Sequence, residues 1–308
     1  VKLNGKIIVY HVSHSANYGR KAIPEGMYLR MVDDPDRLNT AVKPALKNLC
    51  FDKVVIDLGC GTGILGLYAL ENGAKFVYFV EQDTYMIDII EKALPKIADP
   101  TRFKIIHNYA QHLEESDFDK ETPEICVSEL WGILLFDEGY YHCTNPLKKL
   151  FKDLVFIPEI FHLDVFECDP NFGSLPWPEN ETHLVEHYKH LYANIGWSNN
   201  ALGIPYNTVN DSGAARKCEF RNPKKIGEIH YNANTGVFNN KLSVVIHPKD
   251  GKMINFSGKM ISDGIHQNGP DFGWYVFPSD EPVIIDTFVR KDSEDANVYF
   301  YVKPYKKK

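Results

Sequence analysis

The fold is decided by the stretch Val54-Val-Ile-Asp-Leu-Gly-Cys-Gly-Thr-Gly-Ile-Leu65. Its first five residues, Val54 to Leu58, predict a buried strand because they are apolar and β-branched except for one Asp. The glycine-rich run Gly59-Cys-Gly-Thr-Gly63 follows, and the apolar spacing over Ile64 to Glu71 then predicts a helix. Glycines let a backbone approach a ligand closely, and a helix N-terminus offers free N–H groups. The stretch therefore predicts a ligand-binding loop between a strand and a helix.

The same alternation continues downstream. Buried strands are predicted over Phe76 to Val80, Phe103 to His107 and Ile125 to Ser128, and helical spacing covers Thr84 to Ala93. Strands that alternate with helices form parallel sheets with right-handed crossovers. Residues 51–158 are therefore predicted to form a Rossmann-like domain.

Beyond Pro158 the pattern changes to short strand-like runs separated by Gly, Pro, Asn and Asp. These runs predict an antiparallel sandwich or barrel over residues 159–308, with strands at 161–166, 241–247, 283–289 and 298–302. Residues from about 170 to 225 are rich in Pro, Asn and Trp, which favours an arm or insertion. The sequence thus predicts an α/β domain followed by a β domain.

Composition narrows the class of protein. Of 308 residues, 44% are hydrophobic and 24% charged, which is typical of soluble globular proteins, and we expect no membrane span or leader. The formal net charge of -7 argues against a nucleic-acid binder and is compatible with a basic partner. The six cysteines have no metal-ligand spacing, so we expect no metal and reduced thiols, as in a cytoplasmic or nuclear protein.

The spacing of the loop indicates its ligand. Gly59-x-Gly61-x-Gly63 differs from the Gly-x-Gly-x-x-Gly of dinucleotide enzymes. With Asp57 two residues ahead, it is typical of S-adenosylmethionine binding, which we favour over a nicotinamide cofactor.

Two later segments extend this predicted pocket. Glu81 ends the second strand, where a carboxylate can accept hydrogen bonds from both hydroxyls of a ribose. The segment after the third strand should pass beside the adenine, with the backbone near Ala110 and either Glu114 or Glu115 as contacts, although an exposed acidic helix start remains the alternative.

A pair of glutamates marks a second site. Glu129 and Glu138 lie nine residues apart after the fourth strand, and they bracket an apolar turn that contains Trp131 and Gly132. Two carboxylates held close together repel each other unless a cation lies between them. Guanidinium is the matching cation because its planar fork of donors pairs with carboxylates in a bidentate manner.

Together these residues resemble the protein arginine N-methyltransferases. The resemblance covers about residues 25–165, and beyond them it extends only to the architecture. It is carried by Val55 to Leu65, Val80-Glu-Gln82, the double-glutamate loop from Ser128 to Glu138, Pro158, and an N-terminal helix signature over Met31-Val-Asp-Asp-Pro-Asp-Arg37.

The resemblance implies roles for individual residues. S-adenosylmethionine would donate a methyl group to arginine in a basic protein, and Glu129 and Glu138 would clamp that arginine. Trp131 and Trp274 would line a water-poor site, and Met31 would shape the pocket around the target nitrogen. The cofactor would be held through its methionine carboxylate by Arg37, through its ribose by Glu81, and along its pocket by Asp57, Gly59, Cys60, Gly61 and Gly63.

The resemblance also implies architecture and assembly. Residues 1–50 would form a helical segment that completes the cofactor pocket, and the arm would pack on a second subunit to give a homodimer. One departure stands out: the barrel stretch Phe272-Gly-Trp-Tyr275 keeps the Trp of the family's Thr-His-Trp loop and lacks the His. Phe272 to Pro278 resembles the version in enzymes that make symmetric dimethylarginine, whereas Met31 is closer to the asymmetric class, so the methylation product stays open. Two alternatives also stay open: a relative that binds or activates a partner, and a small-molecule methyltransferase.

Overall fold

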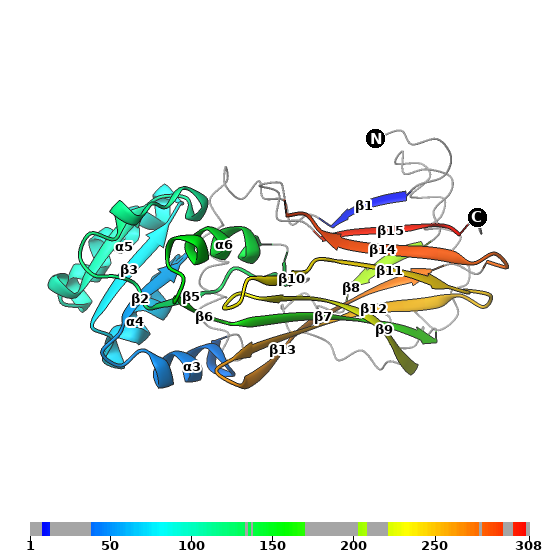
Figure 1. The fold of residues 1–308 in the computed structure, drawn as a ribbon, viewed down its shortest axis with the longest axis horizontal. Coiled ribbons are helices and arrows are strands. Elements are labelled where there is room, and N and C mark those ends of the chain that lie inside the picture. The colour runs from blue at the N-terminus through cyan, green and yellow to red at the C-terminus, as the bar shows by residue number, and fades with distance from the viewer. Residues whose placement is uncertain are drawn as a thin grey trace.

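The computed structural model describes residues 8–12, 38–132, 135–136, 138–169, 203–207, 221–276, 279–291 and 298–305. For residues 8–12, 203–207 and 270–275 the description is limited to the backbone. The described elements form a parallel α/β part and an antiparallel part that lie end to end (Figure 1).

The α/β part is a parallel sheet with the strand order β4-β3-β2-β5-β6. All residues of β2, β3 and β5 are buried, as expected for parallel strands covered on both faces. The strands are β2 (Val54–Leu58), β3 (Phe76–Glu81), β4 (Phe103–His107), β5 (Ile125–Ser128) and β6 (Val155–Ile157). This confirms the predicted Rossmann-like domain. The chain proceeds to opposite sides of β2, so the carboxyl ends of β2 and β5 form a switch point, where open α/β sheets bind ligands.

The helices begin and end where local chemistry allows. Helix α4 (Ile64–Glu71) starts after Gly63 and ends at Asn72, as predicted. Helix α5 (Thr84–Ile97) is capped by the Asp83 side chain, which accepts a hydrogen bond from the Tyr85 N–H, and it runs past the predicted end at Ala93. Two further α-helices are α3 (Val42–Leu49) and α6 (Tyr140–Leu150).

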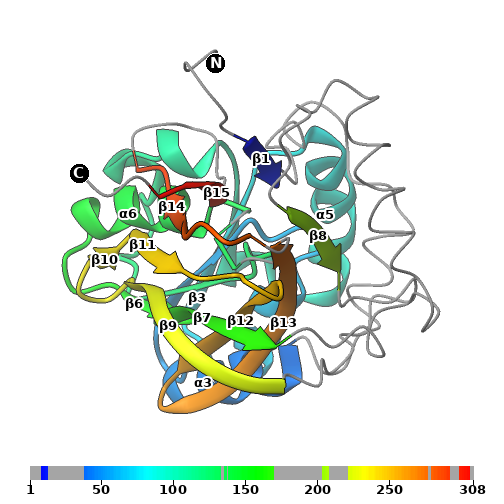
Figure 2. The ribbon, with the colours of Figure 1, turned by 90° about the vertical axis from the view of Figure 1, so that its right-hand side faces the viewer.

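The antiparallel part consists, among the described residues, of two sheets that curve around a common interior (Figure 2). One has the order β10-β9-β7-β12-β13-β8 and the other β1-β15-β14-β11, which confirms an antiparallel β domain. Strands of the first are β7 (Ile160–Asp169), β8 (Gly203–Asn207), β9 (Arg221–Asn232), β10 (Val237–Asn239), β12 (Lys252–Ser262) and β13 (Ile265–Val276). Those of the second are β1 (Ile8–Val12), β11 (Lys241–Ile246), β14 (Val283–Val289) and β15 (Val298–Pro304).

The N-terminal segment differs from the prediction. Residues 1–50 were expected to be helical, but residues 8–12 form the edge strand β1, which pairs with β15 from Ile8 opposite Val302 to Val12 opposite Val298. Its sequence, Ile-Val-Tyr-His-Val, is rich in β-branched and aromatic residues, which favour strands. In the described part of residues 1–50, helix α3 agrees with the prediction.

The structure also differs from the arm predicted over residues 170–225, because two pieces of that range are strands. Strand β8 pairs with β13, and residues 221–225 begin β9, which pairs with β7. These pieces belong to the antiparallel sheet. The rest of the predicted arm, 170–202 and 208–220, lies outside the described residues.

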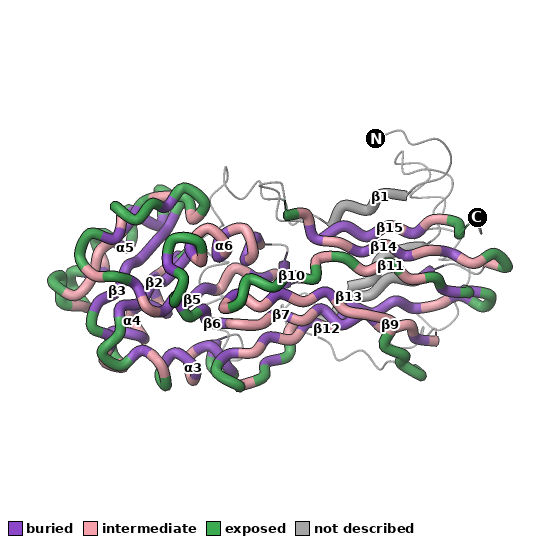
Figure 3. The backbone as a smooth tube through the Cα atoms, viewed as in Figure 1, coloured by how far each residue is buried: buried purple, intermediate pink, exposed green. Residues whose placement is uncertain are grey.

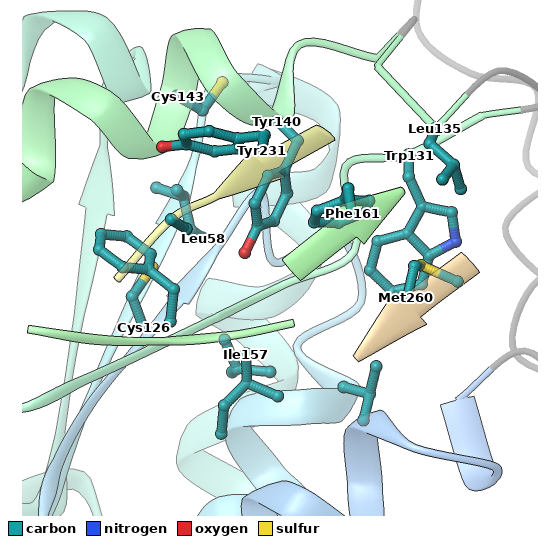
Figure 4. Packing of buried hydrophobic residues seen from close by; sticks show 14 of the residues in the cluster. Leu58, Cys126, Trp131, Leu135, Tyr140, Cys143, Ile157, Phe161, Tyr231 and Met260 are labelled. Carbon is teal, nitrogen blue, oxygen red and sulfur yellow. The ribbon is translucent and has the colours of Figure 1, made fainter. Parts of the chain in front are cut away.

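One hydrophobic core runs through both parts of the molecule (Figure 3). At the junction, the ring of Phe161 in β7 lies 4.2 Å from the ring of Tyr140 and 6.1 Å from that of Trp131, measured between centroids (Figure 4). The Tyr140 hydroxyl donates a hydrogen bond to the Pro158 carbonyl. The loop after β5 is therefore held between the parallel sheet and the antiparallel part.

Candidate active site

The glycine-rich loop is a tight turn that requires glycine. Gly59, Gly61 and Gly63 have φ angles of 67°, 50° and 75°, in the left-handed region that other residues rarely adopt. The N–H groups of Gly59 and Cys60 donate to the Val80 carbonyl at 2.9 and 3.0 Å. A Cβ at Gly59 would lie 2.8 Å from Leu130 Cδ2, so this loop packs directly against the chain that leaves β5.

Asp57 holds this turn from within the sheet. Its side chain is 2% exposed, and its Oδ2 accepts a hydrogen bond of 2.7 Å from the N–H of Gly66 in the first turn of α4. Burial, with a smaller contribution from the nearby charge of Glu81, raises the pKa of Asp57 to about 8, and that hydrogen bond opposes the rise. Asp57 is therefore largely uncharged at neutral pH. This gives Asp57 a structural task beside its predicted place in the pocket lining.

Replacing Asp57 with Asn should change how stability depends on pH. The pKa of Asp57 is raised in the folded chain, so its contribution to stability is complete below about pH 4 and disappears as the pH rises to about 8. We expect Asp57→Asn to remove this loss, which amounts to at most about 1.4 kcal/mol per pH unit. Urea denaturation of parent and variant between about pH 5 and 9 measures it, and parallel pH profiles would contradict a shifted Asp57.

Glu81 is bound to backbone on both oxygens. Its side chain is 7% exposed; Oε2 accepts from the Gly61 N–H at 2.8 Å, and Oε1 accepts from the N–H groups of Gln82 and Asp83, both at 2.8 Å. A carboxylate has about four acceptor positions, so about one remains beside these bonds. A ribose that used both hydroxyls at Glu81 would therefore have to displace a backbone donor, and of these donors Gly61 belongs to the glycine turn. The sequence predicted Glu81 as a ribose ligand, but it did not indicate that three backbone N–H groups already donate to this carboxylate.

The segment after β4, which was predicted to pass beside an adenine, lies next to Glu81. The Asn108 N–H donates to the Glu81 carbonyl at 3.1 Å, and Ala110 begins the short 3-10 helix η3 (Ala110–His112). Glu114 is exposed and caps the next 3-10 turn, η4 (Glu115–Asp117), through the reciprocal hydrogen bonds of a capping box. Its carboxylate therefore already has a local role, and contact with an adenine stays a prediction.

The paired glutamates lie on a loop folded by two consecutive turns. Glu129 directly follows β5, where the Ser128 hydroxyl donates to the Leu58 carbonyl of β2 at 2.9 Å. One turn is closed by the Leu135 N–H on the Gly132 carbonyl at 3.1 Å, and the next by the Gly139 N–H on the Phe136 carbonyl at 3.4 Å. Glu138 lies inside the second turn, directly before α6, and both glutamates are half-buried. Both turns therefore lie between the end of β5, at the switch point of the sheet, and the start of α6.

Other predicted site residues are placed differently or not at all. Trp131 is 5% exposed and packs in the core at the junction, so its described contacts are structural. The backbone of Trp274 pairs with Ile254 of β12 and Pro205 of β8, and its side chain lies outside the description. Met31 and Arg37 lie outside the described residues.

The described part has few other features that bear on chemistry. Cys60 is buried, which raises the pKa of its thiol well above the ordinary value, as do the charges of Asp57 and Glu81. No cluster of three or more His, Cys, Asp or Glu side chains there has an arrangement for a metal ion. No described helix combines the length and apolar character needed to cross a bilayer.

Sequence comparison finds relatives over part of the chain. No protein-family model matches it. Protein arginine N-methyltransferase 1 of Chlamydomonas reinhardtii is 35% identical over 116 residues, which are 37% of this chain and 32% of that protein. The enzyme of the same name from Schizosaccharomyces pombe is 35% identical over 121 residues, which are 37% of this chain and 33% of that protein. The match thus spans about a third of the length of these curated relatives.

Structural similarity extends further. A crystal structure of PRMT6 superposes with a TM-score of 0.58 at 15% identity and covers 91% of this chain and 99% of that one. Trypanosoma brucei PRMT1, in an enzyme-prozyme heterotetrameric complex with AdoHcy, gives a TM-score of 0.59 at 16% identity and covers 92% and 94%. By sequence over more than a third of its length, and by fold over nearly all of it, the chain is similar to the protein arginine N-methyltransferases.

Proposed function

We propose that the chain transfers a methyl group from S-adenosylmethionine to a guanidinium nitrogen of arginine in basic protein substrates. The observation that carries this proposal is the loop with Glu129 and Glu138, which leaves β5 beside the glycine-rich turn and contains two turns before α6. A small-molecule methyltransferase needs the glycine turn and has no need of the paired glutamates. The relatives' names and the AdoHcy in the Trypanosoma brucei complex point the same way.

The described residues fit the cofactor. The left-handed glycines allow close backbone approach at the start of α4, and Glu81 places a buried carboxylate at the end of β3. S-adenosylmethionine, when bound, supplies an activated methyl group on a sulfonium. The remaining work is done by side chains that bind arginine.

Glu129 and Glu138 would do this work by positioning. Guanidinium is a weak nucleophile because its lone pairs are delocalised and its pKa lies far above neutral pH, so it stays protonated. Two carboxylates that pair with it fix the direction of one nitrogen and concentrate positive charge, and placement of this kind supplies about 7–11 kcal/mol in well-oriented reactions. One of the two glutamates takes up the proton as the new bond forms.

Mass spectrometry of an arginine-rich peptide after incubation with S-adenosylmethionine tests the proposal. Methylated arginine is expected, and its pattern also identifies the product as monomethyl, asymmetric or symmetric dimethyl. A matched peptide with Lys at each Arg position is the control and should stay unmodified. Cofactor binding without any methylated arginine would instead favour the binding or activating relative, an alternative consistent with the missing His beside Trp274.

We further propose a homodimer in which an arm within residues 170–225 packs on the α/β part of a second subunit. Exposed apolar side chains on α5 support this: Tyr85, Ile89 and Ile97 are 44%, 37% and 64% exposed. Covering such side chains with a partner removes apolar surface from water, which favours association.

Substitution of these exposed apolar residues tests the dimer. Replacing Ile89 and Ile97 together with Glu should convert the dimer to a monomer, because charges would have to be buried in the interface. Light scattering at micromolar concentration measures the mass. Val237→Glu, at an exposed apolar residue of β10, is the matched control and should leave the mass unchanged. A parent chain that is already monomeric would contradict the dimer.

A further inference from the structure

Leu135, in the middle of the paired-glutamate loop, has an unusual combination of properties. Its side chain is fully buried, and its backbone φ is 61°, in the left-handed region. This conformation costs a residue with a Cβ about 1–2 kcal/mol, and it persists only where the surroundings enforce it. Something in the fold therefore holds Leu135 in place.

The surroundings are two glycines of the antiparallel sheet. A Cβ at Gly258 of β12 would lie 3.0 Å from Leu135 Cγ, and a Cβ at Gly269 of β13 would lie 3.0 Å from Leu135 Cδ2. The register between β12 and β13 shifts between Ser257 and Lys259, so Gly258 lies at a β-bulge. Gly258 and Gly269 together form a socket that leaves room for the leucine because neither has a side chain.

The socket is connected to Glu138 by a short stretch of chain. Leu135 closes the first turn of the loop through its N–H, and the next residue, Phe136, starts the turn that contains Glu138. Phe136 is itself 1% exposed, and its ring stacks on Phe238 at 5.5 Å between centroids. A displacement of Leu135 would therefore move Glu138.

The other end of the loop is attached to the parallel sheet. Glu129 follows β5 directly, Ser128 bonds to Leu58, and Leu130 packs on Gly59. Glu129 is thus attached to the sheet that carries the cofactor loop, whereas Leu135 and Phe136, just before Glu138, pack on the antiparallel part.

We propose that Leu135, seated against Gly258 and Gly269, is a positioning residue that sets the place of Glu138 relative to Glu129. The β12–β13 hairpin thereby controls methyl transfer without touching the substrate's reacting atoms. This inference rests on the proposed function. It predicts that filling the socket slows turnover and leaves cofactor affinity unchanged.

The test adds a methyl group on the glycine side of the contact and then removes side-chain volume on the Leu135 side. Gly258→Ala and Gly269→Ala should each lower kcat by about tenfold or more, because misplacement of a reacting group by 1 Å costs up to about a hundredfold. Leu135→Ala in the Gly258→Ala background makes room for the new methyl group, and the double variant should be faster than Gly258→Ala alone. Affinity for S-adenosylhomocysteine, measured by calorimetry, should stay within about twofold of the parent.

Gly227→Ala is the matched control, because its Cβ would meet Leu242 Cδ1 at 2.2 Å within the antiparallel part and not the loop. It should lower stability and leave kcat of the folded protein unchanged. Hydrogen exchange of the amides of residues 130–139 gives a readout besides activity: we expect faster exchange in Gly258→Ala and parental exchange in Gly227→Ala.

The outcomes separate the two proposals. Parental turnover and parental loop exchange in both socket variants would overturn the positioning role. So would equal slowing by Gly227→Ala with no rescue by Leu135→Ala, since the effect would then be general destabilisation. A parent chain that methylates no arginine peptide would contradict the proposed function alone, and loop exchange would still decide whether the socket holds the loop.

Discussion

Glu129→Gln and Glu138→Gln are each expected to lower turnover of an arginine peptide by at least about a hundredfold, with cofactor affinity nearly unchanged. The amide keeps the size and shape of the carboxylate and removes the charge that pairs with guanidinium and the base that accepts its proton. Both glutamates are half-buried, so water screens their charges only in part. Steady-state kinetics with labelled cofactor measures turnover, and calorimetry with S-adenosylhomocysteine measures affinity.

Glu124→Gln is the control for these two variants. Glu124 lies just before β5, at the opposite end of that strand, where it pairs with Lys53 at 2.7 Å. It should keep parental turnover. If either Glu129→Gln or Glu138→Gln methylated arginine at the parental rate, that residue would be wrongly assigned to the clamp. Equal methylation of lysine and arginine peptides by the parent would contradict the guanidinium site, because an ammonium cannot pair with both carboxylates in a planar, bidentate manner.

Glu81→Gln should weaken binding of S-adenosylhomocysteine by about thirtyfold or more, since hydrogen bonds to a charged group each contribute about 1.5–3 kcal/mol. The structure supplies two reasons. The variant would lose an acceptor for the ribose, and its amide nitrogen would face the N–H of Gly61 or those of Gln82 and Asp83, which now donate to the carboxylate. The glycine turn would lose the bond that fixes it.

Calorimetry on Glu81→Gln distinguishes this from general damage if the unfolding midpoint is followed in parallel. Glu124→Gln again serves as the matched change of charge and should bind the cofactor product like the parent. Parental affinity in Glu81→Gln would show that neither the ribose nor the turn depends on this carboxylate.

Local pattern predicted the α/β part well. The strands at Val54 to Leu58 and Phe103 to His107, and the helix at Ile64 to Glu71, have the predicted bounds because a buried parallel strand and a short helix beside a glycine turn are encoded within a few residues. Helix α6 went unpredicted because it contains Pro146 in its interior and Thr144, which form helices poorly. In α6 tertiary packing outweighs propensity: Tyr140 and Leu147 are fully buried.

The antiparallel part was predicted less completely for a similar reason. Strand β12 mixes Asn255, Ser257 and Lys259 with apolar residues, so alternation is weak, and β13 contains two glycines and a proline. Their pairing is long-range and leaves little local signal. At the N-terminus, the β-branched residues of β1 gave the correct signal, and the helical segment expected from the resemblance was wrong there.

The candidate site shows the same division. Glu81 and Glu129 were predicted as site residues because the ends of parallel strands are where such sheets bind ligands. The bonds of Glu81 to backbone, the cap that Asp57 provides for α4 and the socket of Leu135 were not predicted. Each depends on atoms brought together only by the folded chain, and glycine in a strand gives no indication of which side chain it accommodates.

The hydrophobic core is continuous across the junction, which limits the segments that can be exchanged between this chain and a relative in a chimera. A fragment that ended at Pro158 would leave Tyr140 and Phe136, now 0% and 1% exposed, without the rings of Phe161 and Phe238 that cover them. Uncovered aromatic side chains of this kind favour association between molecules. A chimera that takes the antiparallel part from a relative must therefore also take the loop after β5 from that relative. The loop and the sheet behind it have to be exchanged together, although they belong to different halves of the sequence.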